Sequence, residues 1–284
     1  ELWTWGYNSN GEGGNGNSSS YNYPQVVPSS YFNNKKIVKV CRVCFYAGCA
    51  LTNHGEVYAW GSGSYGAFLK GHTSSYSSPQ LISWFTDNNV KIVDVTGGQY
   101  HWIALSDEGK VYTWGYNSHG QRGNGSAGNN YNNETSPFEL SDFNDSNNGL
   151  YGKVVTHIKA RKNHCMVVTS ENSLYTWGES AEYSLGHSDN TSKYYPTKVD
   201  FDWGGTIVQI DASYRGCMVL TNNGTVYNWG TGNEYGLGQN DTSDYYIPKI
   251  PIGLEEKIIV KIACSQYHSK YAVTHDGELW IWGN

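Results

Sequence analysis

The chain has 284 residues with a formal net charge of −6, and it contains 15% aromatic residues, 34 glycines and 7 prolines. This composition describes a globular chain rich in tight turns and excludes a disordered protein. Because the net charge is negative and no run of roughly 18 apolar residues occurs, we expect neither general nucleic-acid binding nor a membrane span.

A Trp-Gly pair recurs along the whole chain at intervals of 52 to 63 residues. The repeated tryptophans are Trp5, Trp60, Trp114, Trp177, Trp229 and Trp282. They divide the chain into units at about residues 1–60, 61–114, 115–177, 178–229 and 230–284, with one Asn/Ser-rich insertion at 129–149. A period of this length indicates a tandem-repeat fold in which each unit is one sheet.

The elements repeat in the same chain order. After the strand at residues 2–5 come a glycine-rich loop and a strand that begins with proline at 24–27. Two short strands follow at 37–40 and 49–51, and an Asn-His-Gly turn leads into the next Trp-Gly strand at 57–60. The turn glycine supplies a positive φ, and in the third unit we expect Asn172 to adopt it instead.

Each Trp-Gly strand alternates an aliphatic residue and a smaller residue on one face with two aromatics on the other, as in Val57-Tyr58-Ala59-Trp60. A strand with this pattern is buried on both faces. Sheets stacked against one another around a propeller provide that environment.

The segment at residues 109–125, GKVYTWGYNSHGQRGNG, closely resembles the central motif of regulator of chromosome condensation repeats, and residues 97–101 match the approach to it. The resemblance covers nearly the whole chain, although residues 66–71 and 183–186 depart from the glycine pattern. It implies an all-β propeller of four-stranded antiparallel blades, part of a seven-bladed ring.

The pattern predicts 21 strands, which is not a whole number of four-stranded blades. We therefore expect a single propeller domain over residues 1–284 that is an excerpt of a longer chain. An intact mass of the source protein near 31.6 kDa would contradict this expectation.

The six cysteines comprise one close cluster and three single residues in apolar runs: Cys41, Cys44 and Cys49, then Cys165, Cys217 and Cys264. No second Cys or His pair stands near the cluster at zinc-ligand spacing, so we expect free structural thiols. Free thiols are typical of a reducing compartment, and we expect an intracellular, cytoplasmic protein.

We find no catalytic constellation, and we expect no catalytic residue, no metal and no cofactor. The glycine-rich residues 11–16 lack the helix and lysine of a phosphate-binding loop. His101 and His164 occupy equivalent positions, and we expect each to make the same structural hydrogen bond within its own blade. A metal-ligand role for the two histidines is the alternative.

Tyrosines gather between the glycine loops and the proline strands. They are Tyr21, Tyr23, Tyr76, Tyr131, Tyr194, Tyr195, Tyr245 and Tyr246. Equivalent loops of a propeller emerge on one face, so these side chains could form an arc that binds a protein partner. The alternative is that each tyrosine packs on its own blade beside the proline.

The leading functional hypothesis is a non-catalytic scaffold that binds a partner protein through loops on one face, within a larger assembly. The alternative, implied by the family resemblance alone, is guanine-nucleotide exchange on a Ran-like small GTPase. Exchange would require an acidic loop and a wedge. Candidates such as Asp142 and Asp145 in the insertion match no motif of the family.

Overall fold

The computed structural model describes residues 1–43, 46–128 and 134–284. This described part forms 21 strands in six antiparallel sheets. The number of strands therefore agrees with the prediction from the repeat.

The sheets follow one another along the chain. The first pairs β1 (Leu2–Gly6) with β2 (Tyr21–Val27). Four complete sheets follow: β3 (Ile37–Val43), β4 (Ala47–Thr52), β5 (Val57–Gly61) and β6 (Tyr76–Leu81); β7 (Ile92–Gly97), β8 (His101–Ser106), β9 (Val111–Gly115) and β10 (Phe138–Glu139); β11 (Val155–Arg161), β12 (His164–Thr169), β13 (Leu174–Gly178) and β14 (Lys193–Lys198); β15 (Ile207–Ala212), β16 (Gly216–Thr221), β17 (Val226–Gly230) and β18 (Tyr245–Lys249). The last sheet contains β19 (Ile259–Cys264), β20 (Lys270–Thr274) and β21 (Leu279–Trp282).

Helices are short and lie in the connections. They are η1 (Ser29–Phe32), η2 (Ser64–Gly66), α1 (Ser83–Asp87), η3 (Ala181–Tyr183) and η4 (Asn233–Tyr235). Within the described residues, none of them has the length and apolar character needed to cross a membrane.

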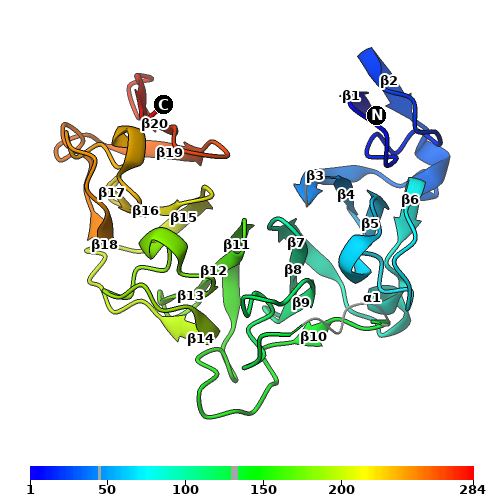
Figure 1. The fold of residues 1–284 in the computed structure, drawn as a ribbon, viewed down its shortest axis with the longest axis horizontal. Coiled ribbons are helices and arrows are strands. Elements are labelled where there is room, and N and C mark those ends of the chain that lie inside the picture. Colours follow the sequence, from blue (N-terminus) through cyan, green and yellow to red (C-terminus); the bar gives the residue numbers. More distant parts are fainter. Residues whose placement is uncertain (44–45, 129–133) are drawn as a thin grey trace.

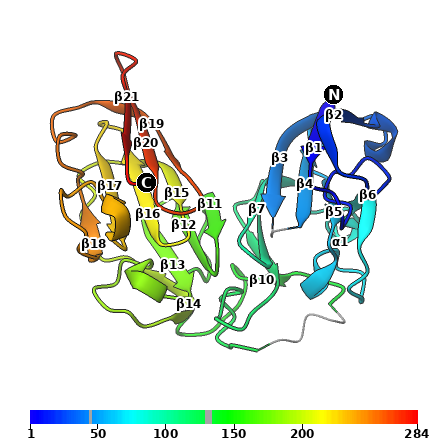
Figure 2. The same ribbon diagram turned by 45° about the horizontal axis from the view of Figure 1, so that its top comes forward.

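The six sheets stand around a central channel as the blades of a propeller (Figure 1). Strands β3, β7, β11, β15 and β19 lie innermost, and β2, β6, β10, β14 and β18 lie at the outside. The described chain forms an open arc, with the two-stranded sheet on one side of the opening and the three-stranded sheet on the other (Figures 1 and 2). The predicted all-β propeller is confirmed.

The Trp-Gly strands are buried on both faces, as their alternation predicts. In β5, Tyr58 and Trp60 pack with Val27 and Phe32 of the preceding blade region. Val57 and Ala59 join the core that includes Trp102 of the following blade. The Trp-Gly strand of a complete blade thus contributes to two hydrophobic cores, one on each face of its sheet.

The repeated tryptophans also make a polar contact across each seam between blades. Trp177 Nε1 donates to Gln121 O of the preceding blade at 2.8 Å. The other buried tryptophans do the same: Trp60 to Glu12 O at 2.7 Å, Trp114 to Ala67 O at 3.1 Å and Trp229 to Ser184 O at 3.0 Å. The acceptors are backbone carbonyls of the glycine loops, so each loop receives the tryptophan of the next blade.

His101 and His164 are equivalent, but the prediction that each bonds within its own blade is wrong. His101 Nε2 lies 3.1 Å from Cys165 Sγ, and His164 Nε2 lies 3.5 Å from Cys217 Sγ, in each case across the seam to the next blade. The reason is that these positions begin β8 and β12, where the side chain faces the neighbouring sheet rather than a strand of its own.

At the next seam, between the blade β15–β18 and the sheet β19–β21, a glycine and a lysine replace the histidine and cysteine. Gly216 stands where the histidine would be, and a Cβ there would lie 3.4 Å from Lys270 Nζ. Lys270 is buried and donates to Gly236 O at 2.6 Å. Burial lowers the pKa of this ammonium to about 8.

The prediction that all six cysteines are free thiols is wrong for two of them. Cys41 and Cys49 form a disulfide between β3 and β4. They are directly opposite in the antiparallel register, with Cα atoms 5.2 Å apart, which is within the range that a disulfide bridges. Cys165, Cys217 and Cys264 are free, and Cys44 lies outside the described residues.

The tyrosine segments are strands rather than loops, which corrects the prediction. Four of the five outer strands begin three residues before their prolines, as in β6 and β18, where Pro79 and Pro248 are the fourth residues. The strand β10 instead begins directly after Pro137. An outermost strand is hydrogen-bonded to a neighbour along one edge only, and its pairing shifts register close to the proline. The backbone N–H that proline lacks is therefore not needed for an interstrand hydrogen bond.

Asn172 adopts the predicted left-handed conformation, with a φ of 60°. Its side chain donates to Gly205 O at 3.0 Å and accepts from Ile207 N at 2.7 Å, which ties the turn to the next blade. We expect Asn172→Gly to cost about 1 kcal/mol of unfolding free energy, because it loses these bonds but keeps the backbone. Asn172→Ala should cost about 2 kcal/mol, because it adds strain at positive φ.

Urea unfolding of the two variants tests this order. A smaller loss for Asn172→Ala than for Asn172→Gly would contradict it.

Candidate interaction face and central channel

Seven of the predicted tyrosines lie within the first three residues of outer strands, and we call them the rim tyrosines: Tyr21, Tyr23, Tyr76, Tyr194, Tyr195, Tyr245 and Tyr246. Tyr131 lies outside the described residues. Tyr21, Tyr76 and Tyr245 are each paired with the glycine of a Trp-Gly pair, so they occupy the same register position on three of the blades.

Part of the rim packs on its own blade. Tyr76 meets Phe68 edge to face at 5.1 Å and lies under Lys70 Nζ at 4.8 Å. Tyr245 OH donates to Asp241 Oδ2 at 2.8 Å. These two tyrosines pack on their own blades, which is the alternative to a partner-binding arc.

Three rim tyrosines remain exposed: Tyr23 by 58%, Tyr194 by 44% and Tyr246 by 45%. Tyr194 lies on Gly120, where a Cβ would come within 2.4 Å of its ring. The Tyr246 ring packs 4.5 Å from that of Tyr183 in η3. An aromatic side chain that is supported on one side and exposed on the other loses little entropy when a partner covers it.

A second group of aromatic residues lies nearer the channel, and the sequence reasoning missed it. Tyr65, Tyr100 and Tyr116 have ring centroids 4.6 to 5.8 Å apart. Tyr214 and Tyr267 form a further pair at 5.1 Å. A tyrosine directly after Trp-Gly, as at Tyr116, was the available signal, but the other positions vary from unit to unit.

The innermost strands enclose a cavity of about 560 Å³. Ion pairs join neighbouring blades there: Lys39 with Asp94, and Lys159 with Asp211 at 2.6 Å. Arg161, also in the lining, lies over the Tyr214 ring with its guanidinium carbon 5.8 Å from the centroid. The channel is therefore polar and carries more cations than carboxylates.

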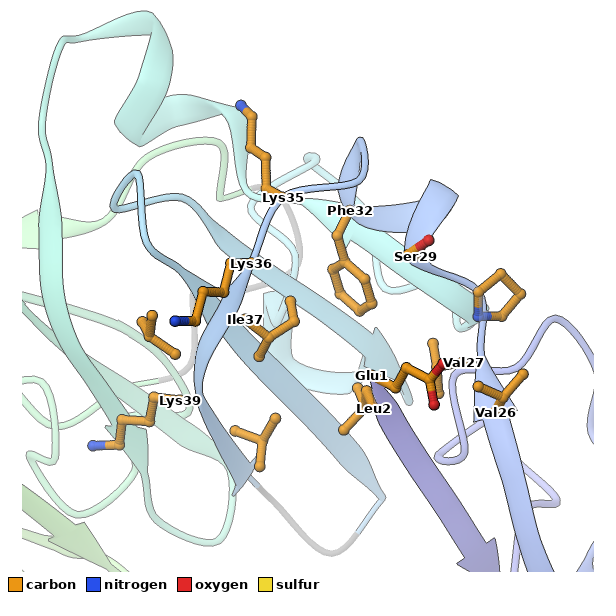
Figure 3. Close-up of a pocket in the computed structure, with 13 residues that line it drawn as sticks. Glu1, Leu2, Val26, Val27, Ser29, Phe32, Lys35, Lys36, Ile37 and Lys39 are labelled. Atoms are coloured by element: carbon orange, nitrogen blue, oxygen red, sulfur yellow. The ribbon is translucent and has the colours of Figure 1, made fainter.

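Another cavity, of about 600 Å³, lies elsewhere, between the two-stranded sheet and β3. Leu2, Phe32 and Ile37 point into it, whereas Lys36 and Lys39 direct their ammonium groups away (Figure 3). In each complete sheet, two further strands lie between the channel and the Trp-Gly strand that corresponds to β1. The two-stranded sheet has no strands at these two inner positions. We interpret this cavity as a packing gap at a sheet edge.

The buried histidines and cysteines are held neutral. Burial lowers the pKa of His101 to about 3 and that of His164 to about 4, and it raises the pKa of the Cys165 thiol. Within the described ranges, no three His, Cys, Asp or Glu side chains come together as a metal site would require.

Asp142 and Asp145, the candidate acidic residues of the insertion, are engaged in structural contacts. Lys110 Nζ donates to Asp142 Oδ2 at 3.1 Å. Asp145 accepts from Asn147 N at 2.9 Å and from Tyr195 OH at 3.1 Å. These backbone and side-chain bonds, the backbone bond first, lower the pKa of Asp145.

Known proteins resemble this chain over most of its length. Human E3 ubiquitin-protein ligase HERC2 is 32% identical over 236 residues, which cover 82% of this chain and 5% of HERC2. The human RCC1-like G exchanging factor-like protein is 31% identical over 243 residues, which cover 82% of this chain and 50% of that protein. The chain thus spans half or less of the length of these relatives.

A solved structure of yeast RCC1 (Prp20) with Kap60 bound matches the fold with a TM-score of 0.81 at 22% identity. The match covers 99% of this chain and 65% of that one, so the sheets of this chain match part of a seven-bladed propeller. A family model of the RCC1-like domain matches residues 1–284. With its repeated Trp-Gly strands stacked as blades, the chain belongs to the RCC1-like domain family.

Proposed function

We propose that this RCC1-like domain is a non-catalytic scaffold that binds a partner protein on the face bearing the exposed rim tyrosines. The observation that carries the proposal is the set Tyr23, Tyr194 and Tyr246, each near half exposed on an outer strand. Tyrosine combines rigid contact area with a polar tip, which suits interface hot spots. Yeast RCC1, which shares the fold, was solved with the protein Kap60 bound to it, and this agrees with a protein-binding role.

Site-specific photocrosslinking tests the proposed face. We expect a benzoylphenylalanine probe at position 194 or 246 to capture the same partner, and a probe at position 151 to capture none. Tyr151 is a matched control because it is 50% exposed but lies in the connection before β11 and not on an outer strand. Equal capture at all three positions would contradict the proposal.

Once the partner is identified, its affinity can be measured directly. We expect Tyr23→Ala, Tyr194→Ala and Tyr246→Ala together to weaken binding by about 2 kcal/mol or more, and Tyr151→Ala to leave it unchanged. Isothermal titration calorimetry gives both values. An unchanged affinity in the triple variant would remove the rim tyrosines from the interface.

Guanine-nucleotide exchange on a Ran-like small GTPase is the second candidate. It is favoured by the relative named as G exchanging factor-like at 31% identity. The contacts of Asp142 and Asp145 with Lys110 and Tyr195 oppose it, because those carboxylates would have to leave their partners to reach a GTPase. Faster release of fluorescent nucleotide from a panel of small GTPases would establish exchange and replace the pure scaffold.

A further inference from the structure

The channel is positively charged although the chain as a whole is negative. Four cations line its cavity, Lys39, Lys159, Arg161 and Lys261. Asp94 pairs with Lys39 and Asp211 pairs with Lys159, each across a seam. In the described part of the chain, Arg161 and Lys261 have no carboxylate within ion-pairing distance, so the channel keeps two uncompensated cations.

Arg161 is held in position without being neutralised. The Tyr214 ring covers its guanidinium, and Tyr214 OH accepts from Gln266 Nε2 at 2.8 Å. The Nε of Arg161 is buried and has no acceptor among the described residues. A guanidinium that is fixed by an aromatic ring and makes no ion pair is suited to bind a carboxylate in a forked geometry.

Lys261 lies at a different depth of the same channel. Its register position on β19 corresponds to His157 on β11, because both follow the register shift near the start of their strand. Arg161 is four residues beyond His157 on β11, which places the two cations at levels about 13 Å apart along the strands. A single small anion cannot reach both levels, whereas an extended chain with several carboxylates can.

We propose that the channel binds an extended acidic peptide segment of the partner protein, with carboxylates at Arg161 and Lys261. The proposal rests on the protein-binding function above and adds the chemistry of the partner. The net charge of −6 repels such a segment from the chain as a whole, so binding has to come from the channel cations. Because Lys39 is paired with Asp94 and Lys159 with Asp211, these two lysines do not compete with Arg161 and Lys261 for the carboxylates of the segment.

The test uses fluorescein-labelled octaglutamate as the probe and octaglutamine as the uncharged control, with binding measured by fluorescence anisotropy. We expect octaglutamate alone to bind, and its affinity to fall when sodium chloride is raised from about 20 mM to about 150 mM. Arg161→Gln with Lys261→Gln should weaken binding by about tenfold or more. The matched control, Lys198→Gln with Lys249→Gln, removes the same charge from the outer strands and should leave binding within about twofold.

Equal weakening in the two double variants would overturn the proposal, because it would show an effect of net charge rather than of the channel. Equal binding of octaglutamine would overturn it as well. Matching urea midpoints establish that both variants fold. If octaglutamate fails to bind the wild-type chain, the channel proposal fails while crosslinking at positions 194 and 246 still decides the scaffold function.

Discussion

Replacing Trp177 with alanine should lower the free energy of unfolding by about 3–5 kcal/mol, as expected for loss of a fully buried tryptophan. Trp177 is completely buried and packs at the seam between the second and third complete blades. Its removal leaves a cavity at the seam. It also removes the Nε1–H donor that lies 2.8 Å from Gln121 O. Equilibrium urea unfolding followed by far-UV circular dichroism measures the loss.

Trp5→Ala is the matched control, because Trp5 occupies the same position of the repeat but is 65% exposed. In the 284-residue chain we expect this substitution to cost less than about 1 kcal/mol. If the two variants lost similar stability, the seam contacts would not explain the role of the repeated tryptophan.

Acidification from pH 7 to pH 5 should destabilise the chain through His101 and His164. Their folded pKa values are about 3 and about 4, whereas histidine in an unfolded chain titrates near 6.5. The unfolded state therefore binds more protons below about pH 6.5, and stability falls as the pH drops toward the folded values. At pH 5 the loss should be about 2 kcal/mol for each histidine.

The double variant His101→Gln with His164→Gln isolates this effect. It should be less stable at pH 7 because the Cys165 and Cys217 contacts are lost, but its stability should change less between pH 7 and pH 5. His187, whose pKa burial also lowers, retains a contribution in both proteins. The range above pH 5 avoids Asp189, whose pKa is lowered by a backbone bond from Thr191 and then by Lys193. Parallel pH profiles would contradict the assignment to the two histidines.

The local elements of the fold could be predicted because their signals lie within a few residues. Gly55 and Asn172 mark turns through their own backbone preference, and the alternation in Val57-Tyr58-Ala59-Trp60 specifies burial on both faces. Four of the five prolines were misread as strand starts, since the sequence does not reveal that an outermost strand tolerates proline in its interior.

The contacts across seams could not be predicted in the same way. Cys165 meets His101 from 64 residues away, and Trp177 donates to a backbone carbonyl, which has no residue-specific signal. The Cys41–Cys49 disulfide depends on the register of β3 with β4, which spacing alone leaves open. The same limit applied to the candidate site, where Tyr65 and Tyr100 meet only because two connections converge.

The seam pairs have a consequence for how the blades are ordered. The histidine of β8 faces Cys165, the histidine of β12 faces Cys217, and Gly216 of β16 leaves space for Lys270. If the blades β11–β14 and β15–β18 changed places, Gly216 would face Cys165 across a void, and His164 would meet the buried ammonium of Lys270. The blades have similar backbones, but their side chains at the seams fit only the correct neighbouring blade. A misfolded state in which the blades pack in the wrong order would therefore be destabilised at its seams.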